Sequence, residues 1–196
     1  MLQNFIILGT SGKRIILGGN SAGANLAVGL LHLCIKNSLP QPDSLFLAYP
    51  SLLCQMFPSP SRLMCLFDPL VMFPFLLRCL NAYADPNYLS KCPRSFEEEI
   101  EASLESNNDP LLSPLLTPRE ILSQFPPTFL FTSDTDPCLD ETVSFSNKLI
   151  QSGIKDVTLD IREGLPHGFL SYTAMSVECQ NALDEITQQL KDLLRL

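Results

Sequence analysis

A strand-like run that ends in the pentapeptide Gly19-Asn20-Ser21-Ala22-Gly23 constrains the fold of this chain more than any other feature. The apolar residues 14–18 precede this G-x-S-x-G pattern, and the helix-favouring residues 24–31 follow it. Between a strand and a helix, G-x-S-x-G predicts a sharp turn that lifts a nucleophilic serine out of a sheet. We therefore expect Ser21 to be a nucleophile and the Ala22 N–H to face a developing oxyanion. The tight turn would also require Gly19, Ala22 and Gly23 to be small. A glycine-rich turn without chemistry is the alternative.

A nucleophilic serine needs a base, and the chain has only two histidines. His32 lies among apolar residues within the helix that follows the pentapeptide, which favours a structural role. His167 lies in a turn-rich segment just after residues 157–161, which alternate like a strand. Loops at the carboxyl ends of strands are where α/β sheets gather reactive groups. We expect His167 to be the base, with a loop imidazole that has no role as the alternative.

Three aspartates follow the strand-like residues 128–132 and compete to orient the histidine: Asp134, Asp136 and Asp140. Asp140 directly precedes a helix-like run, so we expect it to be the N-cap of that helix. Spacing alone does not choose between Asp134 and Asp136. In either case, the order Ser…Asp…His along the chain is that of the α/β hydrolases.

Three segments carry a resemblance to a known family: Asn20-Ser21-Ala22-Gly23-Ala24-Asn25, Asp136-Pro137-Cys138-Leu139-Asp140-Glu141 and Pro166-His167-Gly168-Phe169. They resemble the G-D-S-A-G-G-N, D-P-L-x-D-E and H-G-F signatures of the hormone-sensitive lipase family of α/β hydrolases. Further segments resemble its animal members, among them Ala48-Tyr49-Pro50 and Ser113-Pro114-Leu115-Leu116. Carried over by position, the resemblance implies Ser21 as nucleophile, Asp136 as acid and His167 as base. It leaves Asp134 as a surface carboxylate of the loop.

The chain departs from the pattern of that family in three places. Asn20 and Ala24 stand where the family has Asp and Gly, and both replacements are small enough for the turn. The family also has an H-G-G-G-type loop upstream, which completes the oxyanion hole, whereas this chain has 20 residues before Ser21 and no such segment. Losing one oxyanion donor typically costs about 3–4 kcal/mol of transition-state stabilisation. We therefore expect a C-terminal fragment of a longer protein or a truncated product, and Met1 need not be the biological start.

The pattern of apolar runs predicts an α/β fold over residues 1–196. Strands are expected at 14–17, 44–48, 128–132 and 157–161, and helices at 22–36, 142–152 and 174–193. Strands that alternate with helices form a mostly parallel sheet that is buried on both faces. The expected fold is therefore the C-terminal half of an α/β-hydrolase sheet with flanking helices, in which the N-terminal strands are absent and strand 14–17 is an apolar edge. Residues 51–117 are expected to be an irregular, proline-rich insertion in this partial catalytic domain.

Composition excludes several classes of function. The net charge of −8 argues against nucleic-acid binding. Seven cysteines without a C-x-x-C pair indicate reduced thiols in the cytoplasm rather than disulfides or a zinc site. Charged residues and prolines interrupt the apolar residues 63–80, so we expect no transmembrane span. No metal or cofactor is implied.

These observations together predict a serine carboxylester hydrolase. The resemblance implies neutral-lipid substrates, such as acylglycerols and cholesteryl esters, at a lipid-droplet surface. A small-molecule carboxylesterase, or a truncated chain without catalysis, is the alternative. Five apolar residues could line a cleft for acyl chains, although packing in the core explains each of them equally well: Phe67, Leu70, Phe73, Phe75 and Leu76.

Overall fold

The structure, a computed structural model, describes residues 12–55, 59–64, 71–85 and 108–195, together with residues 87, 95 and 98. Its centre is a four-stranded parallel sheet in the order β1-β2-β3-β4. The strands are β1 (Ile16–Asn20), β2 (Ser44–Ala48), β3 (Thr128–Ser133) and β4 (Val157–Arg162). Asn20 pairs with Ala48, which pairs with Phe131, so the carboxyl ends of these strands lie at one edge. The predicted α/β-hydrolase type of sheet is confirmed.

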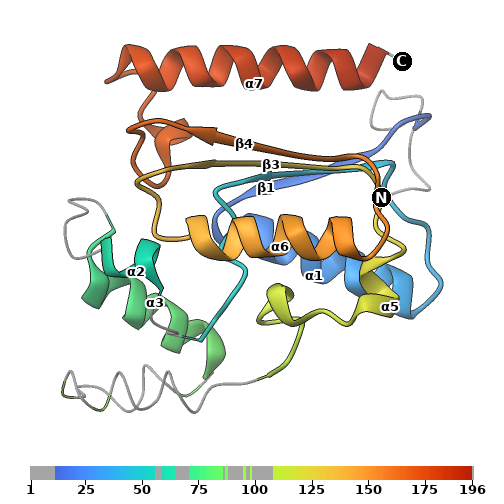
Figure 1. The fold of residues 1–196 in the computed structure, drawn as a ribbon, viewed down its shortest axis with the longest axis horizontal. Coiled ribbons are helices and arrows are strands. Elements are labelled where there is room, and N and C mark those ends of the chain that lie inside the picture. Colours follow the sequence, from blue (N-terminus) through green and yellow to red (C-terminus); the bar gives the residue numbers. More distant parts are fainter. Residues whose placement is uncertain are drawn as a thin grey trace.

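Helices cover both faces of this sheet (Figure 1). Helices α1 (Ala22–Lys36) and α6 (Leu139–Gln151) lie on one face, and α7 (Val177–Arg195) lies on the other. All five residues of β2 are buried between these layers, as expected for an inner strand of a parallel sheet. Among the described residues, β1 has a single strand neighbour, β2.

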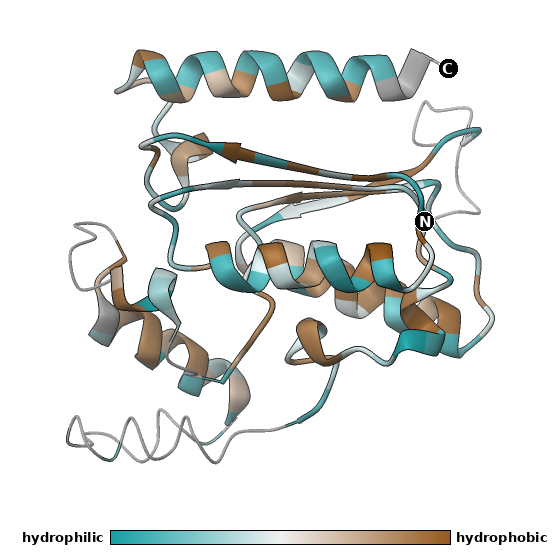
Figure 2. Cartoon of the chain, viewed as in Figure 1, coloured by the Kyte–Doolittle hydropathy of each residue, from teal (hydrophilic) through white to brown (hydrophobic). Residues whose placement is uncertain are grey.

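The core divides into two clusters because side chains alternate between the faces of a strand. Leu45 and Leu47 of β2 join the cluster beneath α1 and α6, whereas Phe46 of the same strand joins the cluster beneath α7. Helix α7 contributes Cys179 and Ile186, and its remaining surface is mostly hydrophilic (Figure 2). Each large apolar side chain buried in these clusters stabilises the fold by about 1.5–3 kcal/mol.

The described part of the chain between β2 and β3 forms four short helices: α2 (Pro60–Met64), α3 (Phe73–Ala84), η2 (Pro114–Leu116) and α5 (Arg119–Leu122). A further short helix, η3 (Phe169–Ser171), follows β4. Figure 1 shows α2 and α3 beyond the end of the sheet toward which the strands run. A third apolar cluster joins the segment after β2 to α3 and consists of Cys54, Leu76, Leu77 and Leu80. Part of 51–117 lies outside the described residues, and its identity as a single insertion stays a prediction.

Most predicted elements match the structure to within three residues at each boundary, and β2 and α1 have the expected bounds. Strand β1 continues to Asn20, beyond the expected end at 17, because the backbone leaves the sheet only at Ser21, with φ 50°. The predicted N-cap of α6 was wrong. The helix begins at Leu139 with Cys138 as its N-cap, and the Asp140 side chain instead accepts a hydrogen bond from the Ser61 N–H at 2.8 Å.

Five described cysteines are free thiols: Cys34, Cys54, Cys79, Cys138 and Cys179. Cys65 and Cys92 lie outside the described residues. In the described part of the chain, no helix combines the length and the apolar character needed to cross a membrane.

Candidate active site

Ser21 occupies the turn between β1 and α1 in a conformation that L-residues rarely adopt, with φ 50° and ψ −118°. Its N–H donates to the Ala48 carbonyl at 2.9 Å, and its own carbonyl accepts from the Asn25 N–H at 3.2 Å. Strain of this kind persists only where the surroundings hold it in place, which is common at functional sites. The turn thus presents the Ser21 side chain at the carboxyl edge of the sheet.

The structure explains why position 19 of the motif is glycine, but it does not explain why position 23 is. A Cβ on Gly19 would lie 2.4 Å from the Gly23 backbone carbon and oxygen, so only glycine fits there. A Cβ on Gly23 would come no closer than 3.7 Å to Asn20 Oδ1, which is an ordinary contact. Glycine is therefore required at position 19, whereas alanine, which is also small, would fit at position 23.

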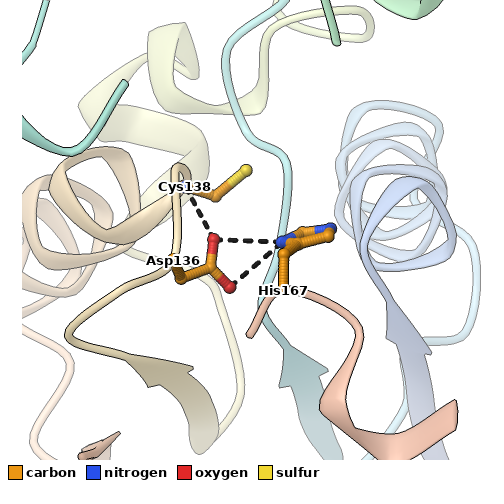
Figure 3. A group of neighbouring side chains, drawn as sticks. All are labelled: Asp136, Cys138 and His167. Carbon is orange, nitrogen blue, oxygen red and sulfur yellow. Dashed lines mark hydrogen bonds and ion pairs between the residues drawn. The ribbon is translucent and has the colours of Figure 1, made fainter. Parts of the chain in front are cut away.

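Three side chains from the loops after β1, β3 and β4 form a continuous hydrogen-bonded path. Ser21 Oγ lies 2.8 Å from His167 Nε2, and His167 Nδ1 lies 3.0 Å from both carboxylate oxygens of Asp136. Figure 3 shows the Asp136 carboxylate facing the imidazole. Because the carboxylate only accepts, Nδ1 carries the proton and Nε2 offers its lone pair to the Ser21 hydroxyl. This arrangement can remove a proton from a serine hydroxyl.

Asp136 and His167 are buried and held from several sides. Asp136 is fully buried, and one of its oxygens also accepts the Cys138 N–H at 2.7 Å. The Tyr49 ring packs edge-on against His167, with ring centroids 5.1 Å apart. Asn20 Nδ2 donates to the Tyr49 hydroxyl at 3.2 Å, so Asn20 supports the ring that packs against His167. Rigid support of this kind keeps a reactive geometry in place.

Asp134, the competing carboxylate, has a different position. It is exposed, and it accepts the Gly164 N–H at 2.7 Å, which ties the loop after β3 to the loop that carries the histidine. Thr135 adds a second tie by donating its hydroxyl to the Leu165 carbonyl at 2.5 Å. The expectation of a surface carboxylate at Asp134 agrees with this position. Asp136, and not Asp134, faces the imidazole.

His32 lies within α1 and is buried. Burial lowers the pKa of its imidazole, and the neighbouring Lys36 acts in the same direction. A buried imidazole agrees with the structural role expected from the sequence.

The Ala22 N–H is the first of α1, and it has no acceptor within the described part of the chain. A backbone N–H at a helix N-terminus attracts negative charge. Ala22 also lines the pocket in front of Ser21. It can therefore donate to an oxygen of a group bound at the serine.

A pocket of about 290 Å³ opens over Ser21 and His167. Helix α3 forms its apolar wall through Leu76, Leu80 and Tyr83, among other residues. The Tyr83 hydroxyl donates to Asn25 Oδ1 at 3.2 Å and so ties α3 to α1 one turn beyond the serine. A larger hollow of about 770 Å³ lies at the amino-terminal ends of the strands and contains none of these groups.

Of the apolar residues expected to line a cleft, Leu76 does so. Phe75 is 57% exposed and is not part of the pocket wall. Phe67 and Leu70 lie outside the described residues, as does the side chain of Phe73. Leu80 and Tyr83 were not predicted, because only the placement of α3 over the serine reveals them.

A buried ion pair behind the site was also not predicted. Arg62 Nη2 lies 2.6 Å from Glu141 Oε2, and both side chains are only 4% exposed. Glu141 Oε1 accepts the Leu52 N–H at 2.8 Å, and Arg62 donates to the Leu53 carbonyl at 2.6 Å. The pair therefore fixes the segment after β2 against α6. Burial raises the pKa of Glu141, and the Arg62 charge opposes that shift.

Among the described residues, one group of side chains that could hold a metal ion lies at this site. The donor atoms of Asp136, Cys138 and His167 all lie within 4.8 Å of one another, and all three residues are buried. Burial, reinforced by the Glu141 and Asp136 carboxylates, raises the pKa of the Cys138 thiol well above its usual range.

Comparison with known proteins places the chain among hydrolases. Residues 3–171 match a family model described as the alpha/beta hydrolase fold. Hormone-sensitive lipase from Mus musculus is 40% identical over 86 residues, which cover 44% of this chain and 11% of the lipase. An esterase from Fusarium pseudograminearum (strain CS3096) is 28% identical over 177 residues, which cover 88% of this chain and 47% of the esterase.

Solved structures agree with this placement. Carboxyl esterase 2 from Tuber melanosporum has a TM-score of 0.76 at 20% identity and matches 97% of this chain and 57% of its own. Esterase LipW from Mycobacterium marinum has a TM-score of 0.72 at 25% identity and matches 97% of this chain and 53% of its own. The chain therefore spans little more than half the length of these structures, and it matches about a tenth of the lipase. Because the family model covers most of its length, the chain belongs to the family of proteins with the alpha/beta hydrolase fold.

Proposed function

We propose that this chain carries the Ser-His-Asp catalytic triad of a carboxylic-ester hydrolase. The observation that carries the proposal is the path from Ser21 Oγ through His167 to the buried Asp136, open to an apolar pocket. The similarity to relatives named hormone-sensitive lipase and esterase supports it.

The reaction would run in two halves. Ser21 Oγ attacks the ester carbonyl while His167 Nε2 takes the hydroxyl proton. The carbonyl oxygen gains negative charge opposite the Ala22 N–H, and His167 then gives its proton to the leaving alcohol. Water attacks the acyl-serine by the same route, with His167 again as the base. Asp136 keeps the proton on Nδ1 and stabilises the imidazolium.

We propose that the pocket against α3 receives the apolar part of the ester. Its volume of about 290 Å³ is at the lower end of the ~300–1,000 Å³ of small-molecule pockets, so it has room for one chain rather than a whole lipid. Leu26, which lines the pocket, is 59% exposed, and Met72 at the start of α3 is equally exposed. This apolar surface supports neutral-lipid esters as substrates, such as acylglycerols and cholesteryl esters, taken from a lipid-droplet surface in the cytoplasm.

A small-molecule carboxylesterase is the second candidate on the same triad. The esterase of Fusarium pseudograminearum matches twice as large a share of this chain as the mouse lipase does, 88% against 44%. Rates on a soluble butyrate ester and on emulsified long-chain acylglycerols separate the two. A preference for the emulsion supports the lipase, and a preference for the soluble ester supports the esterase.

We further propose that residues 1–196 form part of a hydrolase catalytic domain, in which 51–117 is an inserted segment. The pocket wall supports this division, because α3 lies within that segment and covers the serine.

Replacing Leu80 by tryptophan tests the assignment of the pocket. Leu80 is 6% exposed and faces the pocket, so a larger side chain there shortens the space for an acyl chain. One methylene in an apolar pocket is worth about 1–3 kcal/mol. We expect the ratio of kcat/KM for octanoate to that for acetate p-nitrophenyl esters to fall about tenfold or more. Leu30→Trp, on the half-exposed outer side of α1, is the control and should leave the ratio unchanged. An unchanged ratio in Leu80→Trp would place the acyl chain elsewhere.

A further inference from the structure

Within the described part of the chain, the Cys138 thiol is the soft donor grouped with Asp136 and His167, and the proposed reaction does not use it. Cys138 directly precedes α6, is 2% exposed, and shares the pocket wall with His167. Figure 3 shows its side chain beside the Asp136 carboxylate and the imidazole. Thiolate, imidazole and carboxylate are the three protein ligands that Zn²⁺ uses.

The spacing of the three donors is close to that of a zinc site. In tetrahedral coordination with bonds of about 2.0–2.3 Å, neighbouring ligand atoms lie about 3.3–3.8 Å apart. His167 Nδ1 is 3.0 Å from each Asp136 oxygen, and no pair of donor atoms exceeds 4.8 Å. Bringing the most distant pair of donor atoms, at most 4.8 Å apart, to that spacing requires a shift of about 1 Å. Cys138 and His167 line the pocket, which gives an ion a route to the site.

We infer that Asp136, Cys138 and His167 bind a thiophilic divalent cation such as Zn²⁺, and that this cation reversibly inhibits ester hydrolysis. The binding rests on the geometry of the three donors alone. The inhibition rests on the proposed function.

Inhibition follows from the position of the proton on the imidazole. Zinc takes the lone pair of His167 Nδ1, so the proton held there moves to Nε2, and the Cys138 thiol releases its proton to solvent. One proton leaves for each ion bound, and no electron is transferred. With Nε2 protonated, the imidazole donates to Ser21 Oγ at 2.8 Å and has no lone pair to accept the serine proton. The nucleophile is then inactive although all three residues remain in place.

The ligand set also predicts selectivity. Mg²⁺ and Ca²⁺ prefer sites built from oxygen atoms, whereas a thiolate and an imidazole suit Zn²⁺ and Co²⁺. Cys79 lines the same pocket on α3 and is exposed, but it does not belong to the cluster of three donors. Substituting Cys79 and Cys138 separately therefore distinguishes metal binding by any thiol of the pocket from metal binding at the proposed site.

Cobalt binding to the Ser21→Ala variant tests the site without any need for activity, because that variant keeps all three ligands. Titration with Co²⁺ should produce a thiolate-to-cobalt charge-transfer band at one ion per chain. The band should disappear in Ser21→Ala/Cys138→Ala and persist in Ser21→Ala/Cys79→Ala, with circular dichroism showing that each variant is folded. Absence of the band from folded Ser21→Ala, or its persistence without Cys138, would overturn the site.

Zinc inhibition of the chain with Ser21 intact tests the consequence. Each rate is measured relative to the same variant without metal, and EDTA should restore it. Even partners outside the ligand shell change metal affinity about 10–100-fold, so Cys138→Ala should raise the half-inhibiting Zn²⁺ concentration about tenfold or more. Cys79→Ala should leave that concentration unchanged, and Mg²⁺ should not inhibit.

Equal inhibition of the parent and Cys138→Ala would contradict the proposal. A cobalt band in a chain that hydrolyses no ester would support the metal site and count against the proposed function.

Discussion

Replacement of His167 by alanine is expected to lower kcat/KM for a short-chain ester by about 10⁴- to 10⁶-fold. Without the imidazole, no described group within hydrogen-bonding distance of Ser21 Oγ can accept its proton, and the leaving alcohol loses its proton donor. The residual rate would come from substrate binding and the oxyanion contact. Initial rates on p-nitrophenyl butyrate measure the loss.

His32→Ala is the matched control because it removes the only other histidine. His32 lies within α1 and contacts no member of the triad in the described structure, so kcat/KM per folded chain should not change. If His167→Ala kept more than about a hundredth of the parent rate, the role of His167 as general base would be contradicted.

Replacement of Arg62 by methionine is expected to lower the free energy of unfolding by about 3–5 kcal/mol. The change leaves the Glu141 carboxylate buried without its partner, and that carboxylate is already costly to ionise because burial raises its pKa. It also frees the Leu53 carbonyl, which Arg62 binds. Urea unfolding followed by circular dichroism measures the difference.

The double variant Arg62→Met/Glu141→Gln separates the buried charge from lost packing. If the unpaired charge causes the loss, the double variant should be more stable than Arg62→Met alone. A loss below about 1 kcal/mol in Arg62→Met would mean that the pair behaves like an exposed salt bridge.

The sequence predicts the parts of this fold that local patterns determine. The run Ser44–Ala48 is apolar enough to be an inner strand, and the helix Ala22–Lys36 begins directly at the motif serine, so both have their expected bounds. The glycines before Ser21 obscured the end of β1, because glycine suggests a turn although Gly18 and Gly19 still pair with β2. Asp140 has the composition of an N-cap, but its contact with Ser61, far away in the sequence, takes precedence.

More of the candidate site than of the structure around it could be predicted from the sequence. Ser21, Asp136 and His167 each follow a strand, and a parallel sheet brings such positions to one edge. Whether Asp134 or Asp136 faces the histidine depends on the direction of the side chain. The spacing of residues along the sequence does not reveal that direction. The partnership of Arg62 with Glu141 has no local signature, because its members are 79 residues apart. The same holds for Tyr83 and Asn25, 58 residues apart, which join only when α3 lies over the serine.

Labelling by a fluorophosphonate probe tests the central claim most directly, because the probe reacts with a serine activated as a nucleophile. Incubation of the folded chain followed by peptide mass spectrometry identifies the modified residue. We predict one adduct, on Ser21, which is absent from Ser21→Ala and forms far more slowly in His167→Ala. A folded chain that stays unlabelled, or that is labelled equally in Ser21→Ala, would contradict the assignment of Ser21 as an activated nucleophile.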